Sequence, residues 1–321
     1  MSPSVLGAVH VVLSIFVMIG LGAFASARGM VDSQGEKLLS QMVTRVGLPG
    51  MIISNIFGQY TRGSLISSAP ALVIPFASLM ICFGIAQIAA RLSGAPEGRR
   101  GVFINMFTFS NAAFIGLPVS IALFGDQAVQ YALLYYIANT TIFWSIGVTG
   151  FMRDARARSG LTAGLTPAQR LKRTFTLPLV TFLSCVALVL LGLSPPRFVM
   201  DSARYVGALV TPLSCLFTGV VLWRTARSGA LAWQRGFGWI SLGRFVIAPL
   251  VMIACTRFMA APRLMGSALI IQSAMPVMAQ TPILAALYGA DEQYAASGTV
   301  LTTLASLVMI PLYMAIMPLI F

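Results

Sequence analysis

Long apolar stretches follow one another along nearly the whole chain, separated by short polar segments. About 20 apolar residues cross the hydrocarbon core of a bilayer as a helix. By this measure we count ten such segments, at residues 5–27, 38–58, 66–90, 102–124, 128–151, 174–193, 203–223, 237–258, 266–288 and 295–320. The pattern predicts an all-α membrane protein with ten transmembrane helices. It divides the chain into a first five-helix unit (1–151), a basic loop (152–173) and a second five-helix unit (174–321).

Two of the apolar segments contain residues that disrupt a helix. FSNAAFIGLP lies in the fourth segment and AMPVMAQTPI in the ninth. Proline has no N–H and clashes with the preceding turn, so Gly116 with Pro118, and Pro276 with Pro282, should interrupt these two helices. Unwound backbone at membrane depth is tolerated only where it is buried in protein or lines a cavity. We therefore expect a central cavity, although the prolines alone would equally suit simple kinks, with Asn111 bonding a neighbouring helix.

The two disrupted segments also belong to an internal repeat. PVSIALFG, which begins at Pro118, and PILAALYG, which begins at Pro282, are identical at four of eight positions and lie 164 residues apart. A weaker match joins GLPGMIISNIF to VTPLSCLFTGV at nearly the same offset. Five crossings separate the members of each pair, and an odd number inverts the second copy. Inverted repeats with broken helices are typical of secondary transporters, which bind substrate where the halves meet.

The candidate substrate-binding residues are those beside the two disruptions, together with polar residues in neighbouring segments. They are Ser110, Asn111, Gly116, Pro118, Gln272, Met275, Pro276, Gln280, Thr281, Pro282, Arg244 and Asn55. Arg244 lies within an apolar segment and would suit a substrate carboxylate, but its long side chain would also reach the membrane interface. Arg45 has the same two interpretations. Asn55 would face the interface between two moving bodies or form a helix–helix hydrogen bond.

Composition and charge fit a membrane protein. The chain is 58% hydrophobic and 9% charged, whereas a soluble domain carries about 25% charged residues. The net charge of +13 follows from bases in alternate loops rather than from nucleic-acid binding. Fourteen bases lie in the loops that face the cytoplasm if both termini are outside, and five lie in the opposite loops. We expect an integral protein of a bacterial inner membrane in this orientation, without a metal or another cofactor.

The motifs resemble those of the auxin efflux carrier family. SNAAFIGLP followed by FGD is similar to that family's Asn…Gly-x-Pro signature, and AMPVMAQTPILAALYGAD to its second proline pattern. The matching positions are Asn111, Pro118, Pro276 and Pro282. The resemblance implies two inverted five-helix repeats with broken, crossing helices 4 and 9, and a distant relation to bile acid:sodium symporters. It also implies a homodimer through helices 1, 2, 6 and 7. The short central loop is typical of bacterial members.

These features favour a small organic anion as the substrate. All eight acidic residues lie in loops or at segment ends, so a cavity between half-helix N-termini would have a positive field. We expect alternating access, elevator-like, with export driven by the membrane potential. Alternatives are a membrane-embedded sensor of the same fold and a sodium-coupled symporter, although no acid lies near the second disruption. The single histidine, His10, and the lack of buried acids argue against an enzyme.

Overall fold

The protein is described by a computed structural model that covers residues 5–63, 65, 69–159, 175, 177–227 and 233–320. Within these ranges the regular structure is helical, apart from one isolated bridge between Ser110 and Val277. The first half contains α1 (Val5–Ala27), α2 (Ser33–Gln41), η1 (Met42–Gly47), α3 (Leu48–Gln59), η2 (Ala69–Leu72), α5 (Val73–Leu92), α6 (Glu97–Thr108), η3 (Ala112–Gly116), α7 (Leu117–Phe124), η4 (Asp126–Ala128), α8 (Val129–Ile142), η5 (Phe143–Gly147) and α9 (Val148–Ser159).

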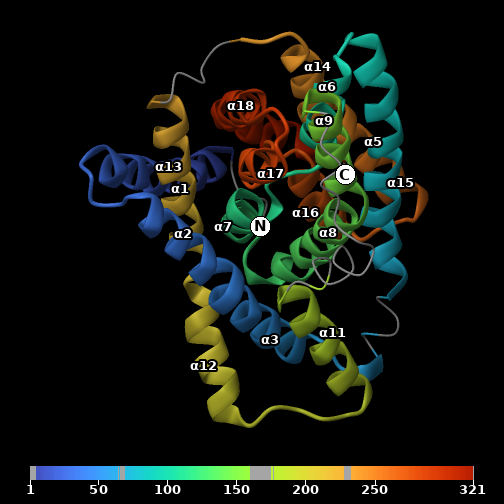
Figure 1. The fold of residues 1–321 in the computed structure, drawn as a ribbon. Coiled ribbons are helices and arrows are strands. Elements are labelled where there is room, and N and C mark those ends of the chain that lie inside the picture. Colours follow the sequence, from blue (N-terminus) through green and yellow to red (C-terminus); the bar gives the residue numbers. More distant parts are fainter. Residues whose placement is uncertain are drawn as a thin grey trace.

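The second half is also helical. It contains α11 (Leu177–Leu190), α12 (Arg197–Ala208), α13 (Val210–Arg227), α14 (Phe237–Leu242), η6 (Gly243–Ile247), α15 (Ala248–Phe258), α16 (Arg263–Ser273), α17 (Thr281–Tyr288) and α18 (Glu292–Ile320). Helices α1, α2, α3, α11, α12 and α13 pack against one another, while α5, α6, α8, α9, α15 and α16 form a second group. Figure 1 shows α7 and α17 near the centre, between these two groups.

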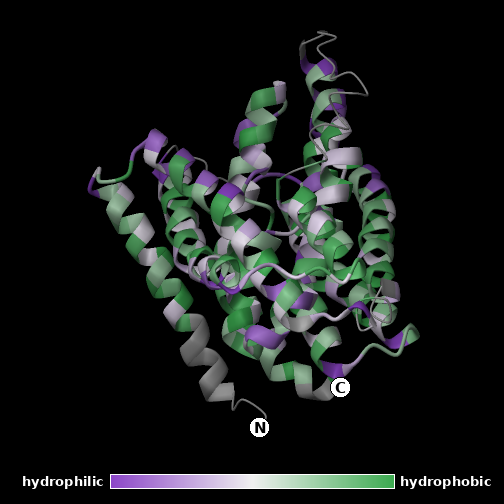
Figure 2. Ribbon diagram, turned by 90° about the horizontal axis from the view of Figure 1, so that it is seen from below, coloured by the Kyte–Doolittle hydropathy of each residue, from purple (hydrophilic) through white to green (hydrophobic). Residues whose placement is uncertain are grey.

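The outer surface requires an apolar solvent. Four helical stretches are long and apolar enough to cross a membrane: Pro70–Leu92, Arg197–Arg227, Phe237–Phe258 and Glu292–Met317. Three shorter apolar helices accompany them, at Leu13–Ala27, Ala112–Phe124 and Leu177–Leu190. Large apolar side chains point outward along whole helices, and Figure 2 shows the apolar ribbon reaching the periphery on several sides. Exposed apolar surface on this scale is incompatible with water, so the chain is an integral membrane protein.

Three prolines follow wider, π-helical turns. The turns η1, η3 and η6 end two residues before Pro49, Pro118 and Pro249. Proline cannot donate to the carbonyl four residues earlier, and a wider turn relieves the clash of its ring with that carbonyl. Thus Leu117 N bonds to Ala112 O, five residues back. The prediction that Gly116 and Pro118 interrupt the fourth segment was therefore wrong in position, because the helix continues through both.

The interruption of the fourth segment lies before its proline, Pro118. The interruption of the ninth segment contains Pro276 and ends before Pro282. In the fourth segment α6 ends at Thr108, and the chain is non-helical from Phe109 to Asn111. In the ninth, residues 274–280 separate α16 from α17 and contain Pro276. Pro282 is the second residue of α17, where a proline costs no hydrogen bond. Each segment thus consists of two half-helices joined by a few residues of unwound backbone.

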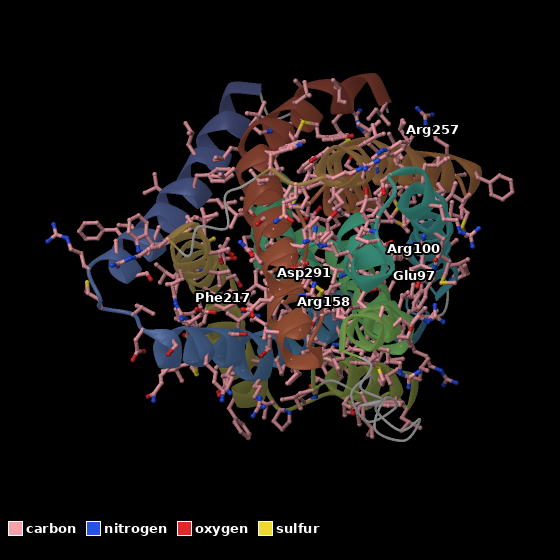
Figure 3. All side chains as sticks on the ribbon, turned by 45° about the horizontal axis from the view of Figure 1, so that its top comes forward. Glu97, Arg100, Arg158, Phe217, Arg257 and Asp291 are labelled. Carbon is pink, nitrogen blue, oxygen red and sulfur yellow. The ribbon has the colours of Figure 1, made fainter. Side chains whose placement is uncertain are left out.

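Ion pairs join elements from distant parts of the sequence. Asp291, just before α18, accepts hydrogen bonds at Oδ2 from Arg99 Nε at 2.6 Å and Arg158 Nη1 at 2.9 Å. Burial by itself raises the pKa of Asp291, but the bonds from the Tyr294 amide and Arg99 outweigh it, so the pKa lies below its usual value. The carboxylate therefore stays ionised and ties α6 and α9 to α18. Figure 3 shows Asp291 and Arg158 side by side.

Glycine allows α1 to pack directly against α13. A Cβ atom on Gly22 would lie 2.2 Å from the Leu216 carbonyl oxygen, and one on Gly219 would lie 1.9 Å from the Ile19 carbonyl oxygen. These neighbours are backbone atoms, which cannot rotate away. By contrast, a Cβ on Gly20, in the same helix, would meet nothing within 4 Å. The close approach of α1 and α13 thus depends on the residue at 22 and not at 20.

We predict that Gly22→Ala lowers the free energy of unfolding by about 1–3 kcal/mol, because the two helices must move apart. Gly20→Ala is the matched control and should leave stability unchanged or slightly raised, since alanine favours the helix. Thermal unfolding of both variants in detergent measures the difference. Equal midpoints would contradict the packing described for α1 and α13.

Candidate functional site

The two unwound segments meet and bond to each other. Ser110 and Val277 form an antiparallel bridge. On either side of it, Asn111 N donates to Pro276 O at 2.8 Å, and Met278 N donates to Phe109 O at 3.3 Å. Backbone groups freed from helices are costly inside a membrane unless they find partners. Each interruption therefore supplies part of what the other needs, and the two cross at this point.

A polar side chain from a neighbouring helix forms hydrogen bonds with each of the two unwound segments. Asn139 of α8 accepts from Ser110 N at 3.2 Å through Oδ1 and donates to Ser110 O at 3.1 Å through Nδ2. Thr302 of α18 accepts from Val277 N at 3.2 Å through its hydroxyl oxygen. Asn139 and Thr302 lie 163 residues apart, one fewer than the offset of the repeated motifs. Each half thus contributes one polar side chain that bonds the unwound backbone of its own broken segment.

Arg244 donates hydrogen bonds to the carbonyl groups at the ends of the two broken helices. Its side chain lies in the π turn η6 and is fully buried. Nε and Nη2 donate to Met275 O at 3.0 and 2.9 Å, and Nη2 also donates to Ser273 O at 2.6 Å. Nη1 donates to Thr108 O at 2.7 Å and to Phe107 O at 3.3 Å. One guanidinium therefore binds the C-terminal ends of both α6 and α16.

This arrangement explains how a positive charge is tolerated at this depth. Helix C-termini carry about half a negative charge each, from carbonyls that lack partners. The Arg244 guanidinium lies against two such ends. The alternative that its side chain reaches the membrane interface is wrong, because the group is buried. Each guanidinium nitrogen already donates to a backbone carbonyl, so the group serves the two broken helices.

A cavity of about 310 Å³ lies beside the crossing. Its walls come from both unwound segments, from η1 and the start of α11, and from α8 and η5. They are formed by Thr44, Arg45, Ser110, Asn111, Ala112, Ala113, Phe114, Tyr136, Asn139, Thr140, Trp144, Leu177, Pro178, Met278 and Gln280. The volume is at the lower end of the range of small-molecule sites, about 300–1,000 Å³. Mixed aromatic and amide walls suit a compact ligand with both polar and apolar parts.

Asn111 lines this cavity and has a side-chain donor without a described partner. Its Oδ1 accepts from Phe114 N at 3.2 Å and caps the helix formed by η3 and α7. No acceptor for its Nδ2 is found among the described residues. The cavity also borders the first residues of this helix and Gln280, which occupies the N-cap position of α17 without a side-chain capping bond. Two half-helix N-termini, each with partial positive charge, therefore meet the cavity wall.

The charges in the cavity wall also suit an anionic ligand. Arg45 is the one charged side chain among the described residues of the wall, and its side chain is exposed. Helix N-termini bind anions through their amides and their dipole. A guanidinium and an asparagine amide add two kinds of donor that suit a carboxylate. The cavity therefore favours a small anion over a cation.

Several predicted residues are not part of the described cavity wall. Gln272 is fully buried and donates to Ser120 Oγ at 3.2 Å. A Cβ on Gly116 would lie 2.2 Å from Gln272 Oε1, so this glycine admits the amide. Asn55 donates to Met51 O in its own helix. The remaining residues outside the described wall are Pro118, Arg244, Met275, Pro276, Thr281 and Pro282, which belong to the crossing helices and their supports.

The wall also contains residues that the sequence analysis did not select. Asn139, Thr140, Tyr136 and Trp144 line the cavity from α8 and η5. A signal was present for Asn139, because an asparagine in the middle of an apolar segment needs a partner. Its partner is the backbone of Ser110, which periodicity cannot reveal. Arg45 was noticed but left between two interpretations, and it lines the cavity.

A membrane-embedded helical fold that encloses a small polar cavity at two crossing broken helices is typical of transporters. The sequence model of the family described as "Membrane transport protein" matches residues 8–314. The chain belongs to this family, and the match confirms the resemblance to the auxin efflux carriers.

Two archaeal proteins named as uncharacterized transporters are similar to it. One, from Methanocaldococcus jannaschii, is 23% identical over 94% of this chain and 96% of its own length. Another, from Methanothermobacter thermautotrophicus, is 24% identical over 68% of each chain. The protein is thus a transporter and not an enzyme.

We predict that Arg244→Met destabilises the fold strongly, because at least three buried carbonyls lose their donor at about 1–3 kcal/mol each. Arg244→Lys should lie between this variant and the wild type, since an ammonium has three donors but no planar fork. Arg263→Met, at the exposed start of α16, is the control for loss of a positive charge. Thermal unfolding in detergent gives the order, and equal midpoints for Arg244→Met and Arg263→Met would refute the role of the guanidinium.

Proposed function

We propose that the protein is a secondary transporter that moves a small organic anion by alternating access, with the cavity at the helix crossing as its substrate site. The observation that carries the proposal is the wall itself. Two half-helix N-termini, the free amide of Asn111 and the Arg45 guanidinium meet there without an acidic side chain among its described residues. An anionic group would bind between them, and the aromatic side chains Tyr136 and Trp144 would contact its carbon skeleton.

We further propose ten transmembrane helices in two inverted five-helix units, with both termini outside. Several ion pairs join loops that this orientation places on the same side of the membrane. The Arg99–Asp291–Arg158 cluster joins loops that this orientation assigns to the cytoplasm, and so does the pair of Arg224 with Glu36. A bacterial inner membrane and a homodimer through helices 1, 2, 6 and 7 remain parts of the proposal that rest on the family resemblance.

The proposed orientation also assigns the cavity to one side. Arg45 lies near the start of the second predicted segment, Leu177 near the start of the sixth, and Trp144 near the end of the fifth. In this orientation all three ends face the cytoplasm. The cavity would then load from inside the cell, and a group of helices carrying the crossing would move, elevator-like, to release the anion outside. A negative interior favours this export by about 2.3 kcal/mol per charge per 100 mV.

Coupling to sodium is not needed in this scheme. Transporters with broken helices often bind Na⁺ through carbonyls at half-helix C-terminal ends. Here the Arg244 guanidinium already lies against those carbonyls of α6 and α16. We therefore infer that a covalently attached cation takes the place of a coupling ion, and that the symporter alternative is less suited to this chain.

We predict that Asn111→Asp abolishes uptake of organic anions into proteoliposomes. Aspartate keeps the cap on Phe114, because both residues are good N-caps, but replaces the free donor with a negative charge. Asn111→Ser keeps the cap without the charge and should raise KM by roughly 10-fold through loss of one hydrogen bond to a charged ligand. A ligand that is cationic or neutral would tolerate Asn111→Asp. Binding without flux in the wild type would instead indicate a sensor.

We also predict that the flux of the anion depends on membrane potential and not on sodium. Replacing Na⁺ with K⁺ or choline on both sides should leave counterflow unchanged. An imposed potential should shift the equilibrium distribution by up to roughly 50-fold per 100 mV for a single charge. Sodium-dependent flux, or flux indifferent to potential, would contradict the proposed uncoupled mechanism.

A further inference from the structure

A second pocket, separate from the crossing, lies between α5, α6 and α9 and has a volume of about 300 Å³. We propose that it binds a phosphate ester, such as the headgroup of an anionic phospholipid. Three arginines from three different helices line it: Arg91 in the last turn of α5, Arg100 of α6 and Arg153 of α9. This site does not depend on what the central cavity carries.

The positive charge of this pocket is only partly balanced. Within the described chain, Arg91 and Arg153 have no carboxylate within 4.0 Å. Arg100 donates through Nε to Ala95 O at 3.1 Å and lies 4.0 Å from Glu97, whose side chain is 83% exposed. Figure 3 shows Arg100 and Glu97 close together, away from Asp291. The guanidinium groups thus retain donors for an anion.

The buried acid in the pocket wall, Asp154, bonds to the backbone of α6. Asp154 accepts from Gly101 N and Val102 N, each at 2.8 Å, one with each carboxylate oxygen. Burial raises its pKa to about 6, although these bonds and Arg158 act in the opposite direction. Its lone pairs therefore serve the backbone of α6. Among the described residues it forms no ion pair with Arg91 of α5 or with Arg153, its neighbour in α9.

The depth of the pocket matches the layer of lipid phosphates. Pro70–Leu92 is one of the four stretches long enough to cross a membrane, and Arg91 lies at its end. Beside it, Ile88 and Leu92 are exposed by 59% and 67% and face the surroundings of the helix. Basic pockets between membrane helices bind phospholipid headgroups at such positions. An acyl chain would follow the apolar face of α5 while the phosphate meets the guanidinium groups.

The closed inner wall argues for a headgroup rather than a passing substrate. Helices α6 and α9 touch at Gly101 and Gly150, where a Cβ on Gly101 would lie 2.1 Å from Gly150 O. Asn105 fills the seam by donating to Gly101 O at 2.7 Å and Gly147 O at 2.9 Å. A phosphate ester offers more charged oxygens than a carboxylate to the three arginines that line the pocket, and guanidinium forks match phosphate geometry.

The test uses the full-length protein purified in a neutral detergent, with thermal unfolding and lipid titration as readouts. Dioleoyl phosphatidylglycerol should raise the unfolding midpoint, and dioleoyl phosphatidylcholine, with the same chains, should not. In the double variant Arg91→Gln/Arg153→Gln the apparent affinity for phosphatidylglycerol should fall at least about 10-fold, as expected for lost hydrogen bonds to a charged group. The control Arg156→Gln/Arg227→Gln removes the same charge from α9 and α13 and should bind as the wild type does.

Glycerol 3-phosphate separates the two sources of the same chemistry. If it stabilises the wild type as phosphatidylglycerol does, and the arginine pair is required, the site takes a soluble phosphate ester instead of a lipid. If both double variants lose affinity equally, the effect is general surface charge and the proposal is overturned. Gln87→Trp, which fills the pocket and keeps every arginine, provides a second variant if the first does not fold; unchanged lipid affinity there would also overturn it.

Discussion

A single buried guanidinium against two sets of helix-end carbonyls is the contact on which the centre of this protein depends. Breaking a helix inside a membrane exposes carbonyls that water cannot reach, and two breaks double the cost. Arg244 binds the ends of α6 and α16 together. Its own burial would be prohibitive without those carbonyls, and their exposure would be prohibitive without it. The charge and the unwound backbone therefore stabilise each other.

With the carbonyl ends closed by protein, the opposite ends of the half-helices become the chemically open part of the crossing. The helix N-termini at Asn111 and Gln280 border the cavity, and Asn139 and Thr302 bond the two unwound segments. Under the proposed function the crossing has two different ends: the Arg244 guanidinium binds the helix C-termini within the fold, and the helix N-termini are left for the anionic ligand. This division explains why the cavity wall needs few charged residues of its own.

Much of the fold followed from local patterns, whereas the roles of individual residues did not. The length of apolar segments, the prolines and the repeated PVSIALFG and PILAALYG motifs predicted two disrupted helices, and the structure contains both disruptions. In the fourth segment the disruption lies before the predicted position, because a π turn accommodates Pro118 within the helix. Helix propensities do not include this effect. For Arg244 the sequence left a substrate carboxylate and the membrane interface open, because sequence alone reveals a charge in an apolar segment without its partners. Those partners are backbone atoms 29 to 137 residues away along the chain.

The π turns have a consequence for how this fold tolerates length changes. Each one holds an extra residue relative to an α-helical turn, and one residue corresponds to about 100° of rotation about the helix axis. Helices α3, α7 and α15 follow η1, η3 and η6, and the extra residue in each turn sets which side of the helix contacts its neighbours. Deleting one residue from such a turn would leave composition and hydropathy almost untouched. It would nevertheless rotate the entire downstream helix away from its neighbours.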